Sequence, residues 1–136
     1  MVLFKIMKQT MTILASLLLA VVLMSADKKD KVMTKENGAY VVNTTEIAKE
    51  VVGYEGATPL KVFIRKNKIE KIEFLPNDET PRYWKAAADH LLHKWDGKTV
   101  KEAKTLKVDG RTGATYSSDA VKENVKRALE YYEKNK

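Results

Sequence analysis

The sequence predicts an α+β fold, in which a small antiparallel β-sheet packs with helices and a long helix forms the C-terminal end. Three observations support this prediction: a pair of adjacent alternating apolar runs, two capped amphipathic segments, and the absence of an internal repeat. At 136 residues, the chain is long enough for one domain and an additional N-terminal segment.

The first 26 residues have the composition of a secretory signal. Lys5 and Lys8 precede an uncharged apolar run over about residues 11–24, which small residues and then charged residues follow. A membrane-spanning helix needs about 20 apolar residues, so this run favours a cleaved signal peptide over an N-terminal anchor. With either interpretation of residues 1–26, we expect export to the periplasm or to the outer face of the cytoplasmic membrane.

Residues 27–38 are mostly charged and end in Asn37-Gly38. This composition predicts a linker that precedes a domain over residues 39–136. The domain is expected to begin with a short strand over residues 39–42. A short helix follows in the prediction, from a Thr44 or Thr45 cap to about residue 52.

The clearest strand signal is a predicted hairpin. Residues 59–66 and 68–75 each alternate apolar and polar positions, and Lys66-Asn67 provides a turn between them. Ile69 is out of phase with Ile72, which predicts a bulge or a change of face at that point.

Two longer helices are predicted after the hairpin. The first begins with Thr80 as N-cap and Pro81 at the first helical position, and Gly97 ends it. Its apolar stripe consists of Trp84, Ala87, Ala88, Leu91 and Trp95. The last helix is capped by Ser117 or Ser118 in this interpretation. Its apolar face consists of Val121, Val125, Ala128, Leu129 and Tyr132.

A brief helical turn lies between these two helices. Thr99-Val100-Lys101-Glu102 has the residue types of a capping box, in which Thr99 accepts a hydrogen bond from the backbone of Glu102.

A polar loop with two glycines leads into the last helix and contains the candidate chemistry. Free backbone N–H groups and the positive end of a helix dipole favour a phosphate at such a junction. Four hydroxyls are available there, on Thr112, Thr115, Ser117 and Ser118. The ordinary alternative is a helix entry whose hydroxyls only satisfy unpaired backbone amides.

The same loop resembles a known motif. Asp109-x-x-Thr112-Gly113-Ala114-Thr115 is similar to the Asp-x-x-Ser/Thr-Gly-Ala-Thr motif of the FMN-binding domain family, whose members include components of the sodium-translocating NADH:quinone reductase and of the Rnf complex. Two more segments resemble the family in the same order, within residues 53–134. These are Gly53-Tyr54-Glu55-Gly56 and Glu79-Thr80-Pro81.

The resemblance implies an exported bacterial flavoprotein with covalently bound FMN. In this family a dedicated flavin transferase uses FAD and a metal ion to attach FMN, through a phosphoester, to the last threonine of the motif, here Thr115. The recognition residues carried over with the motif are Asp109, Thr112, Gly113 and Ala114. The predicted cofactor-binding set is completed by Ser117, Glu79, Thr80 and Tyr83.

The sequence departs from the family pattern after Glu-Thr-Pro. The family usually continues with Gly-Leu-Gly, whereas this chain continues with Arg82-Tyr83-Trp84. Either aromatic ring could stack on the flavin. Trp84 also belongs to the apolar stripe of its helix, which favours a role in packing.

Other classes of function find little support in the sequence. The absence of cysteine excludes disulfides, thiolate metal sites and iron–sulfur clusters. A zinc site at His90 and His93 would need a third ligand, and no motif supports the nearby Asp89 or Asp96 in that role, so no metal site is expected. The net charge of +7 is spread over scattered lysines, and together with the predicted export it gives no indication of nucleic-acid binding.

The resemblance therefore favours an electron carrier or redox subunit over a stand-alone enzyme. We expect membrane or periplasmic redox partners, and membrane association through the N-terminus if it is retained. Two alternatives stay open: a cofactor-free periplasmic binding or inhibitor-like module, and a flavin-using reductase with its own small substrate. The chain's short length disfavours the reductase.

Overall fold

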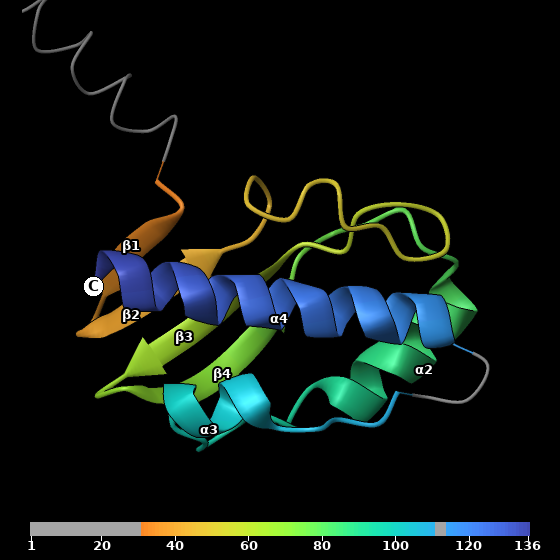
Figure 1. Ribbon diagram of the computed structural model, residues 1–136. Helices are drawn as coiled ribbons and strands as arrows, with labels where there is room; N and C mark the ends of the chain where they lie inside the picture. The colour runs from red at the N-terminus through yellow and green to blue at the C-terminus, as the bar shows by residue number, and fades with distance from the viewer. Residues whose placement is uncertain (1–30, 111–113) are drawn as a thin grey trace, which may run out of the picture. The chain divides into compact units, whose positions relative to one another are not determined.

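The computed structural model describes residues 31–110 and 114–136 of the chain (Figure 1). Residues 32–136 form one α+β unit with a four-stranded antiparallel sheet in the order β1-β2-β3-β4. Helix α4, Thr115–Asn135, lies across one face of the sheet and packs against α2, Pro81–Leu91, and α3, Val100–Thr105 (Figure 1). The predicted fold class and the long C-terminal helix are confirmed.

Two tight turns connect the strands in pairs. Strands β3, Leu60–Arg65, and β4, Lys68–Phe74, form the predicted hairpin. At its turn, Lys66 and Asn67 both have positive φ, at 50° and 65°. Two successive residues with positive φ are the mark of a type I′ turn, which suits the twist of an antiparallel hairpin.

The segment predicted as a linker contains a strand. Strand β1, Met33–Glu36, pairs antiparallel with β2, Ala39–Asn43, around Asn37-Gly38, whose φ angles are 50° and 82°. The linker prediction is therefore wrong for residues 33–38. An Asn-Gly pair is a strong signal for a type I′ hairpin turn as well as for a chain end.

The predicted irregularity in β4 is confirmed. The register between β3 and β4 shifts between Phe63 and Ile64, so that Ile64 lies opposite Ile69 while Val62 lies opposite Ile72. Between these two pairs, β4 has one residue more than β3. This extra residue brings Ile69 and Ile72 to the same buried face, although their spacing in the sequence is odd.

The helix predicted over residues 44–52 is absent. Residues 45–50 form successive turns, and Thr44 is fully buried. Thr44 Oγ1 accepts from the backbone N–H of Leu60 at 2.9 Å and donates to Asn124 Oδ1. Because this hydroxyl contacts α4 and β3, Thr44 does not cap a helix. Arg127 of α4 also holds the segment, through an ion pair with Glu50.

The other helix boundaries differ from the predictions in part. Helix α2 begins at Pro81 as expected but ends at Leu91, and turns continue to Gly97. The expected cap of α3 is present, with the backbone N–H of Glu102 donating to Thr99 Oγ1 at 3.1 Å. In the part of the chain that the structure describes, no helix has the length and apolarity to cross a membrane.

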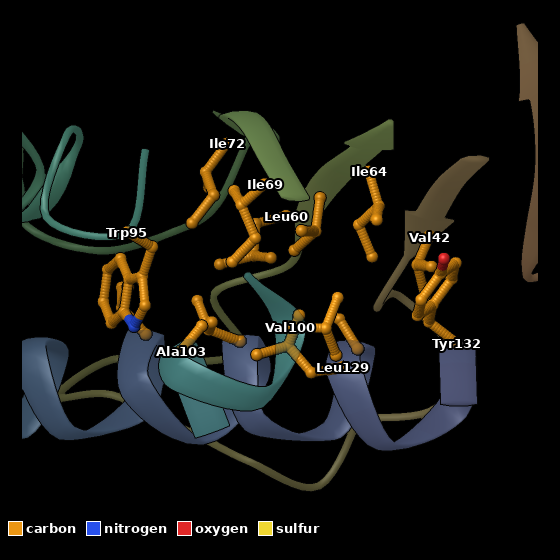
Figure 2. Close-up of a cluster of buried hydrophobic side chains, with 14 of the residues drawn as sticks. Val42, Leu60, Ile64, Ile69, Ile72, Trp95, Val100, Ala103, Leu129 and Tyr132 are labelled. Carbon is orange, nitrogen blue, oxygen red and sulfur yellow. The ribbon is translucent and has the colours of Figure 1, made fainter. Parts of the chain in front are cut away.

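The core lies between the sheet and α4. Side chains of β3 and β4 point toward the helix, where Leu129 faces them, and Trp95 and α3 close the same cluster (Figure 2). The fully buried members include Val42, Leu60, Val62, Ile64, Leu91, Val121 and Leu129. This packing fixes α4 on the sheet and so determines where its N-terminal end lies.

Candidate functional site

A cavity of about 320 Å³ lies at the N-terminal ends of α2 and α4. The turn over residues 53–56 also lines this cavity, through Tyr54. Its lining consists of Tyr54, Glu79, Thr80, Tyr83, Ala114, Thr115, Tyr116 and Ser117. Three segments that are far apart in the sequence therefore meet at one site.

Most of the predicted site residues that the structure describes lie at this cavity. They are Glu79, Thr80, Tyr83, Ala114, Thr115 and Ser117. Asp109 is exposed and does not line it, and its carbonyl oxygen accepts a hydrogen bond from His90 Nε2 at 3.0 Å. Thr112 and Gly113 lie outside the described residues. Cofactor contact by any of these side chains stays a prediction.

Glu79 connects the three segments. Its carboxylate is buried, with 6% of the residue exposed, and accepts three hydrogen bonds. Oε1 accepts from the backbone N–H of Tyr54 at 2.8 Å and from Ser117 Oγ at 3.0 Å, while Oε2 accepts from the N–H of Glu55 at 2.6 Å. Such hydrogen bonds to a carboxylate are stronger than neutral ones, so this residue fixes the turn against α4.

Gly53 makes this arrangement possible. A Cβ atom at this position would lie 1.7 Å from Glu79 Oε1, far inside any permitted contact. The backbone N–H of Gly53 also donates to the carbonyl of Gly56 at 2.8 Å and closes the turn. In the sequence, Gly53 was only one of the residues that resemble the family. The structure shows that the absence of a side chain at Gly53 leaves room for the Glu79 carboxylate.

Thr115 is the first residue of α4 and is exposed to the cavity. The predicted caps are wrong: α4 begins two residues before Ser117, and Ser117 Oγ donates to Glu79 instead of capping the helix. The N-cap position is held by Ala114, which has no side-chain acceptor. Alanine is a poor N-cap residue, so the first amides of α4 receive no hydrogen bond from it.

The two aromatic residues that replace the family's glycine-rich bend have different environments. Trp84 packs edge-on against Phe74, with ring centroids 5.3 Å apart, at the margin of the core. Tyr83 is 53% exposed and lines the cavity. Of the two, only Tyr83 is therefore placed to meet a ligand there.

Tyr54 and Tyr116 line the cavity but are missing from the predicted site. Both are large exposed aromatic residues, with 70% and 69% of their surface accessible. A signal was available, because Tyr54 lies inside the Gly53–Gly56 segment and Tyr116 follows Thr115 directly. Neither position alone indicated that the two rings would meet.

The two histidines are engaged in local contacts. His93 Nδ1 lies 2.7 Å from Asp96 Oδ2, and His90 bonds the loop at Asp109. Among residues 31–110 and 114–136, no group of three potential ligand side chains could hold a metal ion.

Comparison with known proteins identifies the family. The family model of the FMN-binding domain matches residues 53–130, which is more than half of the chain. The chain belongs to the FMN-binding domain family. The matched residues extend from the Gly53 turn through most of α4 and so include every segment that lines the cavity. No curated protein and no solved structure gives a significant match.

The residues around the cavity fit FMN. A volume of about 320 Å³ falls within the range of about 300–1,000 Å³ that is usual for small-molecule sites. Three tyrosines offer aromatic surface for a planar ring system. The uncapped end of α4 is suited to a phosphate, because its N–H groups and its dipole attract negative charge. FMN is accordingly the cofactor that this FMN-binding domain protein carries.

Proposed function

We propose that this FMN-binding protein is an exported electron carrier whose FMN is attached to Oγ1 of Thr115 through a phosphoester. The observation that carries the proposal is the position of Thr115, which is the exposed first residue of α4 and lines a cavity together with three tyrosines. FMN bound there supplies one- or two-electron chemistry, and the protein supplies binding and orientation.

The attachment step balances with FAD as the donor. A flavin transferase would break the phosphoanhydride bond of FAD and form a bond between the FMN phosphorus and Thr115 Oγ1. AMP leaves, and the hydroxyl proton is released. The product is a phosphodiester with one negative charge beside the first turn of α4, where a helix dipole contributes about 0.3–1 kcal/mol to binding an anion.

Export is proposed on the sequence of residues 1–26, which has the order of a secretory signal. In that case the flavin transferase and the redox partners would meet the protein in the periplasm or at the outer face of the cytoplasmic membrane. Thr115 would serve as an anchor and would take no part in turnover.

The experiment that tests the proposal is mass spectrometry on the denatured protein. The full chain is produced together with a flavin transferase whose activity is checked on a second substrate. We expect a mass gain of one FMN less one water, and flavin fluorescence that stays with the denatured chain. Thr115→Ala should abolish both signals.

Thr105→Ala is the matched control, because Thr105 is exposed at the end of α3 and does not line the cavity. This variant should be modified like the wild type. A gain that persists in Thr115→Ala would place the attachment on another hydroxyl. The absence of any gain in the wild type would favour a binding module without covalent cofactor.

A further inference from the structure

Tyr54 and Tyr116 form a pair at the cavity. Their ring centroids are 6.2 Å apart, and the ring planes meet at 40°. Both residues line the cavity that Thr115 opens into, yet each is about 70% exposed. Large aromatic side chains contribute most of their binding energy when their faces are covered, so an exposed pair beside a cavity indicates a surface prepared for a planar ligand.

The pair is held together by the polar contacts beneath it. Tyr54 belongs to the turn whose backbone bonds Glu79, and Tyr116 directly precedes Ser117, which donates to the same carboxylate. Glu79 Oε1 receives one hydrogen bond from each side. One buried carboxylate therefore joins the two segments that contain the rings.

We propose that Tyr54 and Tyr116 form the aromatic wall on which the isoalloxazine ring of FMN packs, and that Glu79 is the positioning residue that sets this wall. The inference rests on the proposed function, since it takes the Thr115 cavity as the flavin site. The flexible ribityl chain between phosphate and ring lets a flavin anchored at Thr115 reach a wall that begins at the next residue. Aromatic contacts of this kind contribute to binding beyond the burial of surface.

The test uses flavin fluorescence, because a tyrosine in contact with the ring quenches it. The flavinylated wild type should be quenched, and Tyr54→Leu or Tyr116→Leu should each raise the emission about two-fold or more, with an unchanged mass gain. The visible circular dichroism of the flavin should weaken in both variants. Val52→Ala is the control, since Val52 is 60% exposed close to the turn but does not line the cavity.

Unchanged flavin emission in both Tyr54→Leu and Tyr116→Leu would show that the isoalloxazine ring does not pack on this pair. A rise confined to Tyr83→Leu would likewise overturn the proposal and assign the ring to the α2 side of the cavity. Tyr54→Phe keeps the aromatic face and should keep the circular dichroism signal. A loss of that signal in Tyr54→Phe would contradict packing through the ring.

Glu79→Gln tests the positioning role. It replaces one acceptor oxygen with an N–H₂ donor that faces backbone donors, so the turn should detach from α4. The emission should rise as in Tyr54→Leu, and the double variant should show no further rise. Ser117→Ala removes only one donor to Glu79 and provides a milder variant. Additive effects of Glu79→Gln and Tyr54→Leu would show that Glu79 does not act through the wall.

Failure of the proposed function is distinguished by mass. If the wild type gains no mass, covalent attachment fails, and free FMN titrated into the unmodified chain still tests the wall. Quenching that Tyr54→Leu and Tyr116→Leu weaken would support the wall without the covalent bond. Unquenched flavin at saturation would overturn it.

Discussion

Glu79 and Gly53 depend on each other for the hydrogen bonds that hold the turn over residues 53–56. The buried carboxylate of Glu79 needs all three of its hydrogen bonds, and Gly53 leaves the space through which it reaches them. The family-like Glu-Thr-Pro segment predicted that Glu79 contacts the cofactor. The structure shows that its oxygens accept three hydrogen bonds from the protein, so Glu79 supports the site, and its contact with the cofactor stays a prediction.

Gly53→Ala should destabilise the domain, because the new Cβ would displace the Glu79 carboxylate and leave polar groups unpaired. We expect a loss of about 1–3 kcal/mol in the free energy of unfolding, measured by urea denaturation. Gly56→Ala is the matched control in the same turn, since nothing lies within 4 Å of a Cβ there and its φ is not positive. Equal stability of the two variants would contradict the role given to Gly53.

The sequence locates the attachment residue better than its surroundings. Thr115 follows from a motif with defined spacing, and a local pattern of this kind can be read from one stretch of chain. Tyr54 and Tyr116 meet only because the Gly53 turn folds onto α4. No local pattern records that contact, so the aromatic pair could not be predicted from the sequence.

Among the secondary structure elements, α4 is joined to the sheet side of the core by the buried polar side chain of Asn124. Its side chain is fully buried, accepts from Thr44 Oγ1, and donates to the carbonyl of Ala120 at 2.8 Å. Thr44 in turn bonds the first residue of β3. This network sets the position of α4 along the strands, and with it the position of Thr115.

Asn124→Ala should lower the free energy of unfolding by about 1–3 kcal/mol, because it removes the close acceptor of the buried Thr44 hydroxyl and leaves that hydroxyl only the longer contact with the Leu60 carbonyl, at 3.3 Å. Asn135→Ala is the control, since Asn135 makes the same bond to the carbonyl four residues earlier but is exposed. Its effect should stay within about 0.5 kcal/mol. Comparable losses in the two variants would show that the buried network adds nothing.

Elements with strong local signals were predicted well, and those defined by distant contacts were not. The β3–β4 turn and the bulge at Ile69 follow from residue types and alternation over a few positions. The helix expected after Thr44 is missing because the threonine is drawn into the core by α4 and β3. The start of α4 was misplaced because Ser117 bonds Glu79, which lies 38 positions earlier.

In the whole molecule, the folded domain begins earlier than the sequence predicted. The sequence suggested a domain from residue 39, whereas β1 precedes it and pairs with β2 through four residue pairs. Val32 and Met33 also pack against the core, and the carbonyl of Val32 accepts from the N–H of Asn43 at 2.8 Å. Because the segment before residue 39 is rich in charged residues, the sequence did not predict β1, which contributes to the core.

A chain that begins at residue 39 should therefore be less stable than one that begins at residue 31. Loss of β1 exposes the edge of β2 and removes two partly buried side chains, which we expect to cost about 1–3 kcal/mol in the free energy of unfolding. Urea denaturation of the two chains measures the difference. Gly38→Ala in the full chain weakens the same hairpin without shortening it, because Gly38 has a φ of 82° and a Cβ there would lie 3.0 Å from Arg65. Equal stability of the two chains would return residues 33–38 to the role of a linker, and the domain would then begin at β2.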